Sequence, residues 1–182
     1  MRFRWWVVIA AGLFFSGFAL GLTVTQPLAE LLGGDIARLR ELAGILTPFT
    51  FGTAVFIYLK NVTALLVSFA FSPLLCLMPI ISMLLNGWLI AFIAAMVVSQ
   101  RSLGFVLAGI LPHGVFELPA LILGGAAALN FGVAMMRAVV LPDARLELLP
   151  KFKQNLKYLG IAALLLLPAA IIETFITPLL VR

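Results

Sequence analysis

Long apolar runs separated by short charged segments dominate this sequence and restrict how the chain can fold. A helix of about 20 mostly apolar residues crosses a bilayer, and residues 5–25 form such a run. Hydrophobic residues make up 64% of the 182 residues and charged residues only 10%, whereas soluble domains average about 45–50% and about 25%. We therefore predict an all-α polytopic membrane protein, with residues 1–182 forming a single integral membrane domain.

Five transmembrane helices are expected from the apolar runs, at residues 5–25, 61–82, 83–99, 112–140 and 159–181. Pro73 and Pro79 interrupt the second run, and segment 102–111 is too short to cross alone. Residues 48–60 are aromatic-rich, which favours an interfacial position; a sixth span drawn from residues 44–60 is the alternative. Residues 28–46 carry apolar side chains at helical spacing among nearly balanced charges, which predicts an amphipathic interfacial helix.

The basic residues predict how the chain is oriented in the membrane. Arg2 and Arg4 precede the first span, and five more lysines and arginines lie within residues 137–157. Cytoplasmic loops are enriched in Lys and Arg, so the N-terminus and loop 137–157 are predicted to be cytoplasmic in the cell membrane, with segment 26–60 outside. A sixth span would place Arg2 and Arg4 on the opposite side of the membrane from loop 137–157, so five spans fit the charge pattern better. The basic loop also attracts anionic lipid headgroups, whereas no stacking or recognition module supports nucleic-acid binding.

Three ionisable side chains lie inside the apolar runs, where a charge costs about 2.5–3.5 kcal/mol and normally faces protein or water. His113 and Glu117 are four residues apart and share a helix face, and Glu173 lies in the last run. If the fourth span starts at Pro112 and the fifth ends near Leu180, both carboxylates lie about 7–10 Å from the outer surface, at 1.5 Å per residue. We therefore predict that the three side chains meet in one intramembrane polar cluster.

Three chemical roles suit such a cluster, and the residue types leave them open. The groups can satisfy one another as interhelical hydrogen bonds, or relay protons or ions. They can also bind zinc or manganese, in which case the ligands are His113, Glu117 and Glu173. The chain has a single histidine, which excludes a zinc site with two or three histidines in one protomer. Because familiar catalytic motifs are missing, we expect neither enzymatic activity nor a cofactor.

Prolines and asparagines add a second set of candidate residues. The predicted helix break comprises Pro112, Gly114 and Pro119, because a proline inside a helix leaves a carbonyl without its usual N–H partner. Such breaks at membrane depth face protein or a wet cavity. Asn61 and Asn86 are therefore candidate cavity-lining residues, with a boundary or packing position as the alternative.

The first span carries a GxxxG motif formed by Gly17 and Gly21. Such motifs permit close helix packing or dimerisation, so a homo-oligomer is one alternative. Cys76 is the lone cysteine, which rules out a disulfide within the chain and favours simple burial.

The segment Pro-His-Gly-Val-Phe-Glu-Leu-Pro-Ala at residues 112–120 resembles the stage II sporulation protein M family of membrane proteins. Residues 56–61, 86–87 and 172–178 stand in the family's order, so the resemblance covers nearly the whole chain. Lys60 before Asn61 is a departure, because the family often has two asparagines there. The resemblance implies five or six spans and, for the family's namesake, the anchoring of two peptidoglycan-degrading partners at the septal membrane.

Together these inferences favour a non-enzymatic membrane scaffold that anchors membrane or envelope protein partners in the lipid bilayer. In that case the polar cluster fixes the helix bundle. The alternative is a small oligomeric transporter or channel in which the cluster moves a proton, an ion or a metal.

Overall fold

The structure is a computed structural model in which residues 1–23 and 48–181 are described. The described part consists of helices joined by short turns, without strands. Its elements are α1 (Phe3–Leu22), α4 (Phe51–Ala70), α5 (Leu77–Val98), α6 (Leu103–Val140), the short 3-10 helix η1 (Pro142–Glu147), α7 (Leu148–Phe175) and α8 (Thr177–Leu180). The amphipathic helix expected at residues 28–46 lies outside the described residues.

Five of the described helices are long and apolar enough to cross a membrane. Large apolar side chains cover their outer faces, for example Phe15 on α1, Leu66 on α4 and Leu164 on α7, which are all exposed. Such a surface is unusual for a soluble protein and suits contact with lipid. The all-α, multi-pass prediction is therefore confirmed, whereas several span boundaries need correction.

The second and third spans begin earlier than predicted. Thr50 caps α4, because its hydroxyl accepts a hydrogen bond of 3.3 Å from the backbone N–H of Thr53. Residues 51–60 are thus the first half of a span, neither an interfacial segment nor a sixth span. Residues 71–76 form a turn at Pro73, and α5 starts at Leu77. Pro79 sits in the first turn of α5, where its missing N–H would have no partner in the helix anyway.

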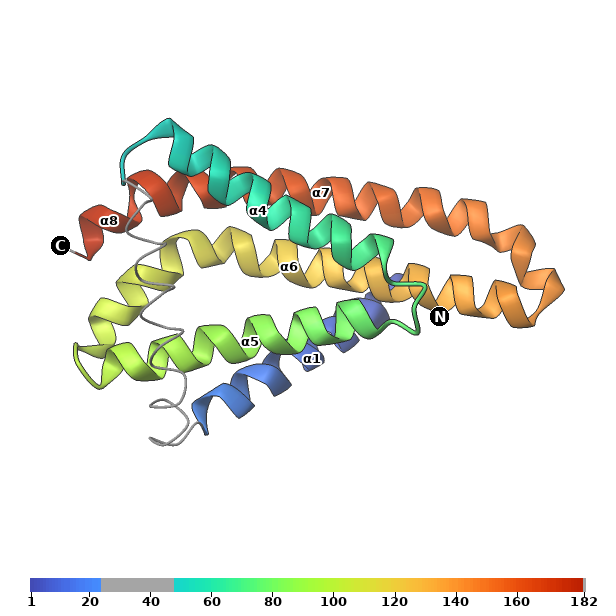
Figure 1. Ribbon diagram of the computed structural model, residues 1–182, viewed down its shortest axis with the longest axis horizontal. Helices are drawn as coiled ribbons and strands as arrows, with labels where there is room; N and C mark the ends of the chain where they lie inside the picture. Colours follow the sequence, from blue (N-terminus) through green and yellow to red (C-terminus); the bar gives the residue numbers. More distant parts are fainter. Residues whose placement is uncertain (24–47, 182) are drawn as a thin grey trace.

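The fourth span also begins earlier than expected. Ser102 caps α6 by accepting a hydrogen bond of 3.2 Å from the N–H of Phe105, and the helix runs unbroken for 38 residues. The predicted break at Pro112, Gly114 and Pro119 is therefore wrong as a helix end. The ribbon instead bends in this part of α6 (Figure 1), because each proline removes one hydrogen bond while its neighbours maintain the helix.

The fifth span begins before residue 159 and ends before residue 181. α7 covers Leu148–Phe175, and the short α8 follows it. Together with η1, the C-terminal end of α6 and the N-terminal end of α7 form a hairpin that projects beyond α1, α4 and α5 (Figure 1). Residues 137–157, the predicted basic loop, belong to this hairpin.

α6 is the central helix and contacts every other described element. Its middle carries the small residues Gly124, Gly125 and Ala126–Ala128, and all five are buried. A Cβ atom on Gly124 would lie 2.6 Å from Leu65 of α4, and one on Gly125 would lie 2.6 Å from the Met83 sulfur of α5. Small side chains here let neighbouring helices approach α6 closely.

The GxxxG motif is used for packing inside the chain. Gly17 lies against the backbone of Leu84 on α5, and Gly21 lies against Trp88 of the same helix. In return, Gly87 of α5 lies against the backbone of Phe14. The close approach of α1 and α5 therefore accounts for these glycines without a second copy of the chain.

We expect Gly17→Ala to lower the free energy of unfolding by about 1–3 kcal/mol, because the added methyl group meets backbone that cannot move aside. The matched control is Gly12→Ala on the same helix, where no atom lies within 4 Å of an added Cβ. That change should be neutral or slightly stabilising, as alanine favours helix. Thermal unfolding in detergent measures both variants, and equal effects would contradict the α1–α5 packing.

Candidate functional site: a His–Glu–Glu cluster between helices

The three ionisable side chains singled out in the apolar runs come together in the structure. His113 and Glu117 project from α6, and Glu173 projects from the last turn of α7. One nitrogen or oxygen atom from each of these residues lies within 4.8 Å of the others. We refer to His113, Glu117 and Glu173 as the polar cluster.

Hydrogen bonds link the polar cluster to two further elements. The Asn61 side-chain amide on α4 donates to Glu117 Oε1 at 3.3 Å. The His113 Nε2 atom lies 3.7 Å from Glu117 Oε2, an ion pair when the imidazole is protonated. On its other edge, His113 Nδ1 lies 3.4 Å from the Thr177 hydroxyl at the start of α8. The cluster therefore connects α4, α6, α7 and α8.

The charges of the cluster are only partly shielded from the surroundings. The side chains of His113 and Glu117 are 16% and 22% exposed. Glu117 experiences the charges of Glu173 and His113, and also that of Lys60, which precedes Asn61 on α4. The two carboxylates thus have one imidazole and one ammonium group as neighbours.

Glu117 and Glu173 meet as predicted, although the helix ends from which their depths were counted were misplaced. Glu117 lies fourteen residues after the start of α6, about 21 Å along the helix, whereas Glu173 is two residues from the end of α7, about 3 Å. The groups nevertheless meet, because α6 is bent and much longer than a single crossing requires (Figure 1).

The donor set of the cluster fits a divalent metal ion in chemical type. It offers one imidazole nitrogen and two carboxylates, and the Asn61 side chain that contacts Glu117 carries an amide oxygen. Nitrogen and oxygen ligands of this kind suit zinc or manganese. The same groups also satisfy one another without an ion, so the arrangement serves either ion binding or interhelical bonding.

The two candidate cavity-lining asparagines occupy different environments. Asn61 is 8% exposed and contacts the cluster. The Asn86 amide donates to the backbone oxygen of Ser82 at 2.8 Å, within its own helix α5. Asn61 therefore contacts the polar cluster, whereas the Asn86 side chain has its partner within its own helix.

Sequence reasoning missed several polar contacts. Thr177 was not singled out as a partner of His113, although it follows Glu173 by four residues and so falls one helical turn further along. A second buried pair joins α6 to α7, where the Asn130 amide donates to Asn155 Oδ1 at 3.0 Å. Asn130 interrupts a long apolar run, and this interruption could have indicated a buried polar contact.

The described residues contain five helices that are long and apolar enough to cross a membrane, one of them the central bent α6, and a shared imidazole–carboxylate cluster. These features define a multi-pass membrane protein. The family model of stage II sporulation protein M matches residues 7–178. The chain therefore belongs to the stage II sporulation protein M family. Searches of curated proteins and of solved structures gave no match.

We expect Asn61→Leu to lower the free energy of unfolding by about 0.6–2 kcal/mol, because it removes an interhelical hydrogen bond and leaves Glu117 Oε1 without that donor. Asn86→Leu is the matched control, since its amide bonds within its own helix. That variant should change stability by less than half as much. Thermal unfolding in detergent gives both values; an equal or larger effect of Asn86→Leu would contradict a stabilising role for the cluster.

Proposed function

We propose that this protein is a non-enzymatic membrane scaffold that anchors envelope proteins. The main support for this proposal is the close packing of the neighbouring helices against the middle of α6. Residues Ala126, Ala127 and Ala128 are 0% exposed, and the Leu65 and Met83 side chains lie close against Gly124 and Gly125, 2.6 Å from where a Cβ atom would stand. This packed layer lies between the polar cluster and the Asn130–Asn155 pair, and close packing of this kind favours a static bundle over a conduit.

The arrangement of the polar cluster also supports a scaffold. Its hydrogen bonds join helices that are far apart in the sequence, as the 56-residue separation of Asn61 and Glu117 illustrates. Interhelical hydrogen bonds in lipid stabilise a bundle by about 0.6–2 kcal/mol each. A rigid bundle with large apolar faces suits the lateral attachment of other membrane proteins. Membership of the family is consistent with the anchoring role that the resemblance implies.

The second candidate function is ion or metal transport, and one specific observation favours it. Three ligand-type atoms lie within 4.8 Å of one another at a partly exposed position. For transport, a conformational change would have to open the packed layer on α6, or several copies would have to form the path between them. The two functions therefore differ in what Glu117 does: it stabilises the fold in one and carries the cargo in the other.

Reconstitution separates the two functions. In liposomes, we expect the purified protein to give proton, zinc and manganese fluxes no greater than those of empty liposomes, and Glu117→Gln to give the same background. Purified in a mild detergent from membranes cross-linked in intact cells, the 19.6 kDa chain should run as a complex with another envelope protein in fixed ratio.

The control variant is Glu147→Gln, which changes an exposed carboxylate in η1 outside the spans. A pH-dependent flux that Glu117→Gln abolishes and Glu147→Gln preserves, in protein that remains folded, would replace the scaffold with a transporter. A chain recovered only by itself, as a monomer or homo-oligomer, would also contradict the scaffold.

We further propose that the chain lies in the cell membrane with its N-terminus and the α6–α7 hairpin in the cytoplasm. Met1 and Trp6 line the same pocket as Arg137 and Lys151, so the two basic regions lie at the same end of the bundle. Lys and Arg are enriched on the cytoplasmic side of membrane proteins, which favours this orientation over its inverse.

Labelling with a membrane-impermeant maleimide tests the orientation. We expect Ser102→Cys, between α5 and α6, to react in intact cells, and Leu146→Cys in η1 to react only after the membrane is opened. Both positions are exposed, Leu146 at 85%, and native Cys76 is only 4% exposed and provides the background. The inverse pattern would contradict the proposed topology.

A further inference from the structure

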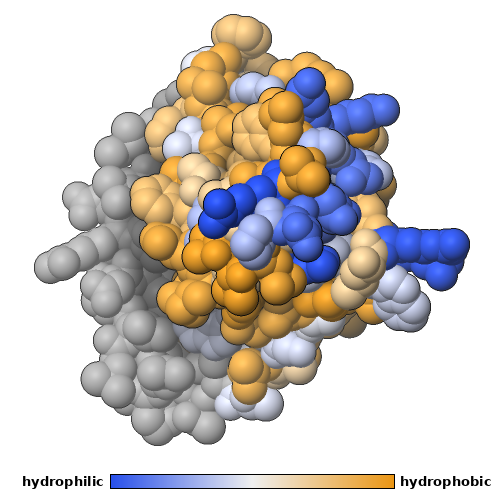
Figure 2. All heavy atoms as spheres, turned by 90° about the vertical axis from the view of Figure 1, so that its right-hand side faces the viewer, coloured by the Kyte–Doolittle hydropathy of each residue, from blue (hydrophilic) through white to orange (hydrophobic). Residues whose placement is uncertain are grey.

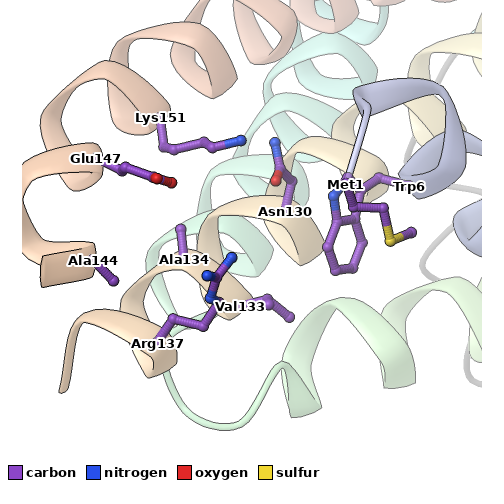
Figure 3. Close-up of a pocket in the computed structure, with 9 residues that line it drawn as sticks. All are labelled: Met1, Trp6, Asn130, Val133, Ala134, Arg137, Ala144, Glu147 and Lys151. Atoms are coloured by element: carbon purple, nitrogen blue, oxygen red, sulfur yellow. The ribbon is translucent and has the colours of Figure 1, made fainter. Parts of the chain in front are cut away.

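A pocket of about 190 Å³ opens at the end of the bundle that carries the basic residues. Figure 3 shows that its walls come from the start of α1, from α6 and from the η1–α7 segment of the hairpin. Polar and charged side chains on the walls are those of Trp6, Asn130, Arg137, Glu147 and Lys151. None of these residues belongs to the polar cluster, which lies about 20 Å away along α6, because Asn130 follows Glu117 by thirteen positions at 1.5 Å each.

One wall of this pocket carries a buried hydrogen-bond donor without a partner. The indole Nε1 of Trp6 is buried and makes no hydrogen bond, one of two such side-chain atoms in the described part of the chain. The indole nitrogen lies on the edge of the ring turned towards Asn130 (Figure 3). A buried N–H left unpaired destabilises the fold, so an occupant with an acceptor oxygen would satisfy it.

The charge around the pocket favours an anionic occupant. Two cations, Arg137 and Lys151, face one acid, Glu147, on its walls. Residues 1–6 and 137–157 together contain seven lysines and arginines against two acids. Figure 2 shows hydrophilic side chains gathered on this end of the molecule, beside broad apolar surface. An anion whose other end is apolar fits both parts of that surface.

A buried polar chain holds the basic wall in position. Asn130 donates to Asn155, and the Asn155 amide donates to the backbone oxygen of Lys151 at 2.8 Å. Asn155 is 0% exposed and Asn130 is 5% exposed. The Asn130–Asn155 bond joins α6 to α7 one turn beyond Lys151, so the pocket lies beside a buried polar contact between these two helices.

The level of the pocket points to a lipid rather than a soluble anion. Trp residues gather at the membrane–water interface, and Arg137 lies two turns beyond Asn130, about 10 Å further along α6. Basic pockets between spanning helices on the cytoplasmic side bind lipid headgroups. We propose that this pocket binds the phosphate of an anionic phospholipid, with Arg137 and Lys151 contacting its charge and the Trp6 N–H donating to an oxygen.

Thermal shift of the purified whole chain in neutral detergent tests this site. The probes are phosphatidylglycerol, phosphatidylcholine with the same acyl chains, and inorganic phosphate. We expect phosphatidylglycerol to stabilise the protein at a concentration at least tenfold below that needed for either other probe. Equal half-saturation by inorganic phosphate would assign the pocket to the free anion, and equal half-saturation by phosphatidylcholine would reduce it to a general lipid contact; both results overturn the proposal.

Variants locate the binding. The double variant Arg137→Gln/Lys151→Gln should raise the half-saturating concentration of phosphatidylglycerol at least tenfold, as expected for two basic residues at about fivefold each. Lys153→Gln/Lys157→Gln removes the same charge from exposed positions of α7 and should raise it less than threefold.

Trp6→Phe provides an independent variant, because it keeps the ring and removes the unpaired N–H. We expect it to raise the half-saturating concentration about fivefold while the melting temperature without lipid stays the same or rises. An unchanged half-saturating concentration in Trp6→Phe, or equal effects of the two double variants, would overturn the pocket as the site.

Discussion

Ionisable groups among apolar helices need partners from the protein itself, and this requirement shapes the end of the bundle where α7 meets α8. Water is missing from the hydrocarbon core, so an unpaired carboxylate or imidazole there is costly. Glu117 meets this requirement through Asn61 and His113, and His113 through Thr177. These contacts bring α4, α6 and α8 together beside the end of α7. These polar contacts therefore help to specify which of the helices meet.

Packing of small residues organises the rest of the structure. α1 approaches α5 through Gly17, Gly21 and Gly87, and the glycines and alanines in the middle of α6 admit α4 and α5. In lipid the hydrophobic effect does not drive helices together, so close van der Waals contact replaces it. The dense layer and the polar cluster thus have complementary roles: one closes the bundle and the other fixes which helices meet.

The class of protein and the meeting of His113, Glu117 and Glu173 could be predicted from the sequence, because hydropathy and the cost of a buried charge act locally and strongly. The apolar runs alone left five and six spans open. Helix boundaries were less accessible. The caps at Thr50 and Ser102 decide where α4 and α6 begin, and these caps cannot be recognised from the lengths of the apolar runs. Pro112 and Pro119 predicted a break, but a helix surrounded by packed neighbours tolerates a bend. Contacts such as Asn130–Asn155 depend on the register of two helices, which periodicity does not determine.

A double-mutant cycle between Asn61 and Glu117 measures the interaction on which this interpretation rests. The cycle compares the free energies of unfolding of Asn61→Leu, Glu117→Leu and the double variant in detergent, because a cycle isolates the pairwise contribution. Cooperation across α4 and α6 predicts a coupling energy of about 0.6–2 kcal/mol, the range of hydrogen bonds between membrane helices. A coupling energy indistinguishable from zero would show that the two side chains do not hold the helices together, and the polar cluster would lose its structural role.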